Sequence, residues 1–390
     1  MAFRFIANPH LHFGPGTINR LPELVPPHGN TLLLITGAQS LQKSNHWPRL
    51  LDALKKESIR VYQAVVKTEP SPSMIDEIVL GYRDQNIDVI AAIGGGSVMD
   101  AGKAVSAMMT KNESIIEYLE GVGNRSHDGK KIPFIAVPTT SGTGSEATKN
   151  AVISQLGANG FKKSLRHDNF VPDIAVVDPE LTLDCPPEIT AACGMDALTQ
   201  LLESLVSTQS SPMTDSLALG ALGILGEALI TATTKHPHDI AARTNISYAS
   251  YISGLTLANA GLGVVHGFAS VIGGAFNIPH GVICGTLLAE VTRHTIESLI
   301  SMDPNGPALA KYAGAFRRLH PSQVLESPVE SSRHLIKLLD RWTDQLNMPG
   351  LCAYGVTLKD IDSIVSSTGQ KNNPIQLSAK KLSQILQSRL

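Results

Sequence analysis

Short apolar runs, each ended by glycine or polar residues, recur through the first half of this 390-residue chain. Runs of about four to eight apolar residues with such ends predict buried strands. Between two of them, Ser73–Asp84 places its apolar residues at helical spacing. Strands separated by helices need crossover connections, so the pattern predicts a parallel sheet covered by helices on both faces. The predicted strands are Thr31–Thr36, Arg60–Val66, Val89–Ile93, Ile132–Val137 and Ile174–Val177.

Beyond residue 185 the pattern changes to long periodic segments rich in alanine and leucine. Ile189–Ser207 and Ser216–Lys235 are two such segments, and strand-like runs become rare. The sequence therefore predicts two domains: residues 1–185, which form the parallel sheet, and residues 186–390, which are mostly helical. Pro321–Ser332 contains serine and proline and is predicted to be a loop between helices.

Composition excludes several classes of protein. The formal net charge of −2 gives no electrostatic basis for binding nucleic acid or an anionic membrane. Four cysteines without a CxxC pair indicate neither a disulfide framework nor a zinc knuckle. The first residues lack the long apolar stretch of a signal peptide, and Val264–Ala275 is too short and too interrupted to span a membrane. We therefore expect a soluble, cytoplasmic enzyme.

A glycine-rich turn follows the predicted strand Val89–Ile93. Gly94, Gly95 and Gly96 precede Ser97, and a helix-like segment begins at Val98. Glycines allow the backbone to approach a phosphate, and the free amides of a helix N-terminus stabilise its charge. The spacing is neither G-x-G-x-x-G nor a Walker loop, so a plain strand-to-helix turn is the alternative.

A second polar loop, Pro138–Glu146, directly follows the next strand along the chain. Ligands of open α/β sheets bind at the carboxyl ends of the strands, which is where this loop begins. From spacing alone, an ordinary turn rich in serine and threonine explains the loop equally well.

Four polar side chains in the second half suggest a metal site. Asp196 and Gln200 are one helical turn apart, and His266 and His280 are each followed by glycine. A carboxylate and two imidazoles suit Fe(II) or Zn(II), whereas the amide of Gln200 is a weak, neutral ligand. The alternative is that the histidines are buried residues whose hydrogen bonds are satisfied within the protein.

Taken together, these segments resemble the iron-containing (group III) alcohol dehydrogenase family. The resemblance implies a Rossmann-like nucleotide domain followed by an all-helical domain, as in dehydroquinate synthase, with the active site in the cleft between them. It implies hydride transfer between NAD or NADP and an alcohol or carbonyl substrate, with a divalent metal as Lewis acid, in a homo-oligomer. The matching segments are Gly94–Asp100, Pro138–Glu146, Val171–Asp173, Asp178–Thr182, Cys193–Thr199, His266–Gly267 and Pro279–Gly281.

The resemblance also implies roles for individual residues. The segment from Gly94 to Asp100 holds the cofactor, with its pyrophosphate on Gly95, Gly96 and Ser97. The nicotinamide side is lined by Thr139, Thr140 and Ser145, and Lys162 reaches the cofactor. NAD-preferring relatives often carry an aspartate where this chain has Gly37. The loop with Gly37 and Ser40 therefore favours NADP(H) without excluding NAD(H).

Two positions depart from the family pattern. Most members carry histidine where this chain has Gln200, and many carry a second histidine where it has Ser270. The implied ligand set is then Asp196, Gln200, His266 and His280, with weakened metal retention. The missing histidine also resembles the metal-independent maleylacetate reductases, in which His266 or His280 would be the general acid and Ser270 a proton relay.

Two further alternatives share the architecture. Dehydroquinate synthase and its relatives are lyases that use NAD transiently, and turnover of nicotinamide would distinguish them. A non-catalytic nucleotide-binding module with a decayed metal site is the other, although Asp196, His266 and His280 are intact.

Overall fold

The computed structural model describes the chain except residues 1, 7, 156–159, 324 and 326. The chain divides into two compact units. An α/β unit comprises Ile6–Thr140 and Gly144–Asp184. A helical unit comprises Cys185–Leu390 together with Ser141–Thr143 and residues 2–5.

The α/β unit contains a sheet of six strands in the order β1-β8-β5-β4-β2-β3, and every neighbouring pair is parallel. The parallel sheet predicted from the apolar runs is thereby confirmed. Its strands are β1 (His10–Phe13), β2 (Thr31–Gly37), β3 (Arg60–Val66), β4 (Val89–Gly94), β5 (Phe134–Pro138) and β8 (Ile174–Val177).

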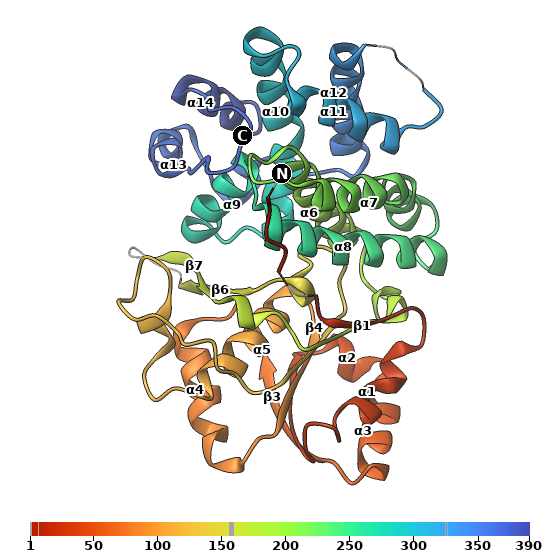
Figure 1. The fold of residues 1–390 in the computed structure, drawn as a ribbon, viewed down its shortest axis with the longest axis vertical. Helices are drawn as coiled ribbons and strands as arrows, with labels where there is room; N and C mark the ends of the chain where they lie inside the picture. The colour runs from red at the N-terminus through yellow and green to blue at the C-terminus, as the bar shows by residue number, and fades with distance from the viewer. Residues whose placement is uncertain (1, 7, 156–159, 324, 326) are drawn as a thin grey trace. The chain divides into compact units, whose positions relative to one another are not determined.

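Helices cover both faces of this sheet (Figure 1). Leu33 and Ile35 of β2 point into a core shared with α4 (Pro72–Tyr82) and α5 (Gly96–Met108). The alternate residues Leu32 and Leu34 point into a second core with α1 (Leu21–Leu24) and α3 (His46–Lys56). Because both faces are buried, these strands are continuously apolar rather than alternating.

The order of strands places the glycine-rich turn at a switch point of the sheet. From β2 the chain passes to β3 on one side and then returns to β4 on the other, with Thr36 of β2 opposite Ile93 of β4. Ligands of open parallel sheets bind at the carboxyl ends of strands at such a point. Gly37 ends β2 and Gly94 ends β4, so both predicted cofactor loops begin there.

Some elements were missed or misplaced by the sequence patterns. The short edge strand β1 and the hairpin strands β6 (Asn150–Gln155) and β7 (Phe161–Arg166) carry too many polar residues to be recognised. The predicted loop Pro321–Ser332 is wrong at its end, because α12 begins at Pro328, a favourable first helical position. Within that loop, residues 324 and 326 lie outside the described part of the chain.

The helical unit is built around α6, which is buried along most of its length and packs against α7, α8 and α10. A single π turn, Thr231–Lys235, follows α7. The helices are α6 (Pro187–Val206), α7 (Pro212–Ile230), α8 (Ile240–Ala260), α9 (Val264–Ala275), α10 (His280–Met302), α11 (Pro307–Leu319), α12 (Pro328–Gln345), α13 (Ile361–Ser367) and α14 (Ala379–Gln387).

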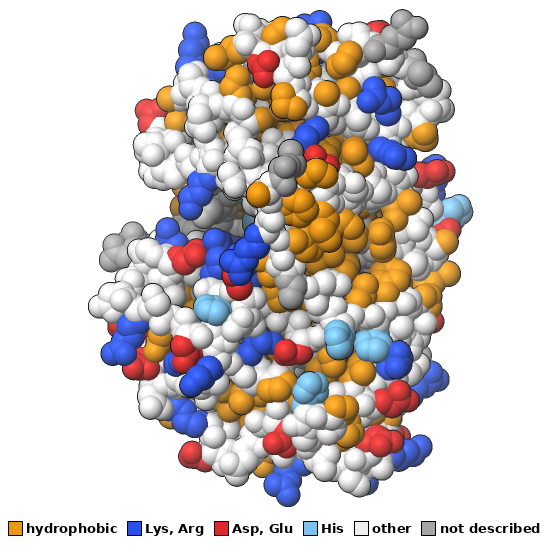
Figure 2. All heavy atoms as spheres, viewed as in Figure 1, with side chains coloured by type: hydrophobic (Ala, Val, Ile, Leu, Met, Phe, Trp, Pro, Cys, Tyr) orange, Lys and Arg blue, Asp and Glu red, His pale blue; other side chains and the backbone are white. Residues whose placement is uncertain are grey.

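Among the described residues, one helix, Pro212–Lys235, is long and apolar enough to cross a membrane. The bent pair Ile240–Ala260 and Val264–Ala275 passes the same test of length and composition when taken together. Because α7 packs against α6, α8 and α11, it is a core helix of the unit. On the face drawn in Figure 2, basic and acidic side chains are interspersed, which fits the small net charge.

Candidate metal centre

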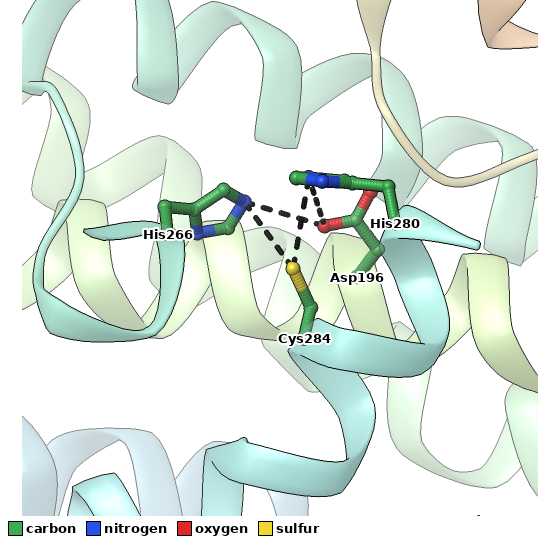
Figure 3. Close-up of side chains that lie close together, drawn as sticks. All are labelled: Asp196, His266, His280 and Cys284. Atoms are coloured by element: carbon green, nitrogen blue, oxygen red, sulfur yellow. Dashed lines mark hydrogen bonds and ion pairs between the residues drawn. The ribbon is translucent and has the colours of Figure 1, made fainter. Parts of the chain in front are cut away.

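Four potential metal ligands from three helices converge in the helical unit (Figure 3). Asp196 comes from α6, His266 from α9, and His280 and Cys284 from α10. Their ligand atoms all lie within 4.8 Å of one another. Asp196 and both histidines were predicted as ligands, and the structure brings them together; Cys284 was not predicted.

The distances between ligand atoms suit one shared ion. Asp196 Oδ1 lies 3.3 Å from His266 Nε2 and 3.7 Å from His280 Nε2. The sulfur of Cys284 lies 3.7 and 3.6 Å from the same two nitrogens. Ligands held about 2.0–2.3 Å from a tetrahedral ion are separated by roughly 3.3–3.7 Å. The residues therefore fit a divalent transition metal.

Two glycines allow the histidines to reach this point. A Cβ on Gly281 would lie 2.4 Å from the carbonyl oxygen of Ala192 in α6. A Cβ on Gly267 would lie 2.0 Å from the carbonyl oxygen of Gly369. In both cases only glycine permits the close approach of the backbones, which explains why each histidine is followed by glycine.

Glu203 orients one of the histidines. Its Oε2 lies 2.7 Å from His266 Nδ1, and its Oε1 accepts a hydrogen bond of 2.7 Å from the amide of Val265. With the Nδ1 proton donated to Glu203, His266 Nε2 presents its lone pair to a metal. Sequence reasoning missed Glu203, although its position two helical turns after Asp196 places it on the same face of α6.

The buried charges of the cluster favour a positive charge at its centre. Burial alone would lower the pKa of His266, yet Cys284, Asp196 and Glu203 raise this pKa well above its usual value. Burial alone would raise the pKa of Asp196, and the neighbouring His280 and His266 lower it instead. Burial raises the pKa of the Cys284 thiol to about 12 in the absence of a cation. A divalent ion held by the cluster would reverse that preference and favour the thiolate.

The expectation that Gln200 completes the ligand set is not supported. Its carbonyl oxygen, the atom that would bind a metal, accepts a hydrogen bond of 2.9 Å from Ser253 on α8. Its amide nitrogen donates to the carbonyl oxygen of Thr143 at 3.3 Å. Gln200 thus ties the segment Ser141–Thr143 to α6, and Cys284 supplies the fourth ligand atom. Cys284 is four positions after His280 on α10, a helical spacing that could have revealed it.

Ser270, the predicted proton relay, lies on α9 one turn after His266 and is exposed. Within the cluster, the side chains of His280 and His266 are 29% and 13% exposed, whereas Asp196 is 2% exposed. The histidines are therefore the more exposed members of the cluster.

In the α/β unit, the glycine-rich turn forms the start of α5. Gly95 is the N-cap, and its carbonyl accepts from the amides of Val98 and Met99. Its φ of −75° is open to any residue, and a Cβ there would approach the nearest atom, Thr140 Oγ1, only to 3.4 Å. The space around Gly95 therefore admits a side chain, and the packing of the fold does not require glycine at this position. Thr139 lies alongside, with its amide donating to the Gly94 carbonyl at 2.9 Å.

A buried lysine that sequence reasoning missed holds the second polar loop. Lys103 Nζ donates to the Ser145 carbonyl at 2.8 Å, to Thr148 Oγ1 at 2.9 Å and to the Asn150 carbonyl at 2.8 Å. Ser145 Oγ in turn donates to Asp100 Oδ1 at 2.7 Å. Asp100 and Ser145, both predicted to bind cofactor, thus share a network that fixes the loop.

Burial lowers the pKa of Lys103 to about 8 and raises that of Glu146, in the same loop, to about 7. Two other predicted cofactor residues lie elsewhere in the unit. Lys162 on β7 forms an ion pair of 2.6 Å with Glu69, and Ser40 is exposed at the start of α2 (Ser40–Lys43).

The sheet with a glycine-rich loop at its switch point and the buried ligand cluster define a nucleotide-dependent metalloenzyme. Residues 8–179 match the family model described as "Iron-containing alcohol dehydrogenase". Residues 190–390 match "Fe-containing alcohol dehydrogenase family, C-terminal". The chain belongs to the iron-containing alcohol dehydrogenase family, whose enzymes interconvert alcohols and aldehydes with NAD(P).

Individual relatives agree with this assignment. The chain is 32% identical to long-chain-alcohol dehydrogenase 1 of Geobacillus thermodenitrificans, over 94% of this chain and 90% of that one. It is 30% identical to the NADPH-dependent butanol dehydrogenase of Clostridium saccharobutylicum, over 98% and 97%. The crystal structure of a 1,3-propanediol oxidoreductase matches all of both chains with a TM-score of 0.89 at 26% identity. The predicted fold class and activity are therefore confirmed.

Proposed function

We propose that this enzyme reduces an aldehyde to its alcohol, and catalyses the reverse reaction, with a divalent cation held by Asp196, His266, His280 and Cys284. The observation that carries the proposal is the spacing of the four ligand atoms, which matches that around a single tetrahedral ion. A cation held there supplies Lewis-acid polarisation of the substrate oxygen.

The remaining chemistry is divided between the cofactor and the side chains. A nicotinamide cofactor, when bound, would supply the hydride chemistry at the alcohol carbon, and the hydroxyl proton would leave to solvent. Glu203 Oε2 holds the proton on His266 Nδ1 and so keeps His266 Nε2 available as a ligand. The exposed edges of His266 and His280 leave a side of the cluster open to the substrate oxygen.

The cofactor pyrophosphate is assigned to the backbone of Gly95, Gly96 and Ser97. Amides in the first turn of α5 have no partner within the helix, and the helix dipole adds positive potential. Support comes from Gly95, where glycine is not needed by the fold. Thr139 and Thr140 are assigned to the nicotinamide side, and Lys162 to a polar contact with the cofactor.

The end of β2 supports acceptance of NADP(H). Gln42 donates to Thr36 Oγ1 and to the Gly37 carbonyl, so amide groups rather than a carboxylate surround this end. Lys43, exposed at the end of the short helix that begins at Ser40, is a cation whose Nζ donates to Gln39 Oε1 at 2.7 Å. Gly37 has no acidic side chain that would repel the 2′-phosphate of NADP(H). The ribose hydroxyl of NAD(H) is still accommodated.

A metal-independent reductase is the second candidate, because the family histidine is absent at Gln200. The presence of Cys284 as a fourth ligand atom favours the metal-dependent form. A lyase of the dehydroquinate synthase type would reduce and reoxidise its NAD within each turnover, so it would show no net change in nicotinamide.

A screen of aldehydes with NADPH and NADH tests the proposed activity. We expect one nicotinamide oxidised for each aldehyde reduced, with NADPH used at least as well as NADH. Consumption of no nicotinamide with any aldehyde or alcohol would contradict the proposal.

A further inference from the structure

The sulfur of Cys284 occupies the place of a ligand at the centre of the cluster. The side chain is fully buried and lies one helical turn after His280 on α10. Its Sγ is nearly equidistant from the two histidine nitrogens, at 3.7 and 3.6 Å, and Figure 3 shows it pointing to the same centre as both rings. A cysteine packed as a structural residue has no need to face three other ligand atoms.

Gln200, one helical turn after Asp196 on α6, has partners outside the cluster. Both ends of the Gln200 amide form hydrogen bonds, one with Ser253 and one with the Thr143 carbonyl. The amide of Gln200 is therefore engaged by Ser253 and Thr143, and Cys284 on α10 is the fourth side chain whose ligand atom lies in the cluster.

The distances between the ligand atoms can be compared with two coordination geometries. Ligands at right angles around an octahedral ion, about 2.1 Å from it, lie about 3.0 Å apart. Tetrahedral ligands lie roughly 3.3–3.7 Å apart. The 3.3 Å between Asp196 Oδ1 and His266 Nε2 and the 3.7 and 3.6 Å between Cys284 Sγ and the two histidine nitrogens are close to the tetrahedral case. The 3.7 Å between Asp196 Oδ1 and His280 Nε2 is longer than either geometry requires. Tetrahedral sites with nitrogen and sulfur ligands are typical of zinc, which takes a fifth ligand when a substrate binds.

Charge also balances in a zinc site of this composition. One carboxylate, Asp196, and one thiolate, Cys284, neutralise a divalent ion, and the thiol proton is released to solvent on binding. Thiolate is a soft ligand and imidazole a borderline one, so replacing an imidazole by a thiolate favours zinc over iron(II).

We propose that Cys284 binds the catalytic metal as a thiolate and that this member of an iron-containing family is a zinc enzyme. The inference rests on the proposed function, because it concerns the metal of the same site.

Cobalt substitution tests the sulfur ligand without measuring turnover. Apoenzyme loaded with Co(II) is expected to show a sulfur-to-cobalt charge-transfer band in the near ultraviolet. We expect the band to be lost in Cys284→Ser and retained in Cys352→Ser, whose cysteine is exposed and distant in sequence from the cluster. A wild-type enzyme without the band, or a Cys284→Ser variant that keeps it, would overturn the proposal.

Two measurements on the wild type remain informative even when Cys284→Ser does not fold. X-ray absorption at the zinc edge is expected to show one sulfur at about 2.3 Å among lighter ligands at about 2.0 Å. Anaerobic incubation of apoenzyme with equal amounts of Zn(II) and Fe(II) is expected to give at least tenfold more bound zinc. A shell of nitrogen and oxygen only, or iron bound as well as zinc, would contradict the proposal.

These outcomes are distinct from failure of the proposed function. Aldehyde reduction with a metal that has no sulfur ligand would reject the thiolate and leave the dehydrogenase activity intact. A sulfur-ligated zinc with no nicotinamide turnover would reject the activity and leave the assignment of the ligand intact.

Discussion

At the scale of single residues, the ligand set depends on side chains that hold the ligands in place. Glu203 is 7% exposed and bonds both His266 and the amide of Val265. Such carboxylate–histidine pairs fix the tautomer and raise the basicity of the metal-binding nitrogen. The site thus includes one carboxylate beyond the four ligands.

Replacement of Glu203 by glutamine tests this role. The amide retains the size of the side chain but removes its charge, so we expect Glu203→Gln to weaken metal binding by about 10- to 100-fold. Competition with a chelator of known affinity measures the change. A glutamine variant that binds metal as the wild type does would show that Glu203 serves only packing. NMR of the His266 ring in the metal-free protein shows which ring nitrogen carries the proton, and we expect the proton on Nδ1, beside Glu203.

Prediction of the site from sequence succeeded where a residue type is unusual in its setting. Histidines followed by glycine in apolar surroundings identified His266 and His280, because buried histidine needs a partner. Cys284 was not predicted as a ligand, because a single cysteine among apolar residues is more often a small core residue. Support for Gln200 as a ligand is lacking, because spacing places it on the face of Asp196 but does not report its bonds with Ser253 and Thr143.

At the scale of elements, the α/β unit shows which glycines serve the fold and which serve a ligand. A Cβ on Gly102 would lie 2.6 Å from Ala92 Cβ, so α5 needs that glycine to pack on the sheet. A Cβ on Gly95 would make only an ordinary contact with Thr140.

We expect Gly95→Ala to fold normally and to weaken nicotinamide cofactor binding by about tenfold, or about 1.4 kcal/mol. The added methyl group would separate the pyrophosphate from the amides at the start of α5. Titration calorimetry measures the dissociation constant. Gly81→Ala, where a Cβ meets nothing within 4 Å, is the matched control. An unchanged dissociation constant in Gly95→Ala would contradict the pyrophosphate assignment.

The end of β2 allows a separate test of cofactor choice. A Cβ on Gly37 would meet Val98 at 3.7 Å, so a side chain is accommodated there. We expect Gly37→Asp to shift the ratio of kcat/KM values toward NADH by at least about tenfold, because the carboxylate repels a 2′-phosphate. A wild-type enzyme that strongly prefers NADH would show that this loop has been misinterpreted.

Helices and strands could be predicted from the sequence where one face or both faces of the element are buried, because burial leaves a pattern of apolar residues. The central strands β2, β4 and β5 are continuously apolar because both faces are covered. The hairpin strand β7, with Lys162, Lys163 and Arg166, lacks that signal, because its pairing with β6 rather than burial makes it a strand.

At the scale of the whole molecule, buried ionisable groups make stability depend on pH. Burial raises the pKa of Glu146 to about 7, so the folded state keeps a proton that the unfolded chain has released. The contribution of Glu146 to the free energy of unfolding therefore falls as pH rises from about 4.5 to about 7.

Glu146→Gln removes this titration, because glutamine mimics the protonated carboxyl. Denaturant unfolding between pH 5 and 7.5 is expected to show a steeper loss of stability with rising pH in the wild type than in Glu146→Gln. Parallel pH profiles for the two proteins would contradict the assignment of a protonated Glu146.

The oligomeric state and the cytoplasmic location stay predictions at this scale. We expect a dimer or larger assembly in solution, as inferred from the family resemblance. Light scattering coupled to gel filtration measures the assembly directly.

The dependence of turnover on bound metal tests the central claim most directly. Activity with NADPH and an aldehyde, measured against metal content during stepwise chelation, is expected to fall in proportion to bound metal. We expect activity to return when Zn(II) is added back. Full activity in protein verified to contain no metal, with turnover still dependent on His266 or His280, would contradict the account and assign the enzyme to the metal-independent reductases.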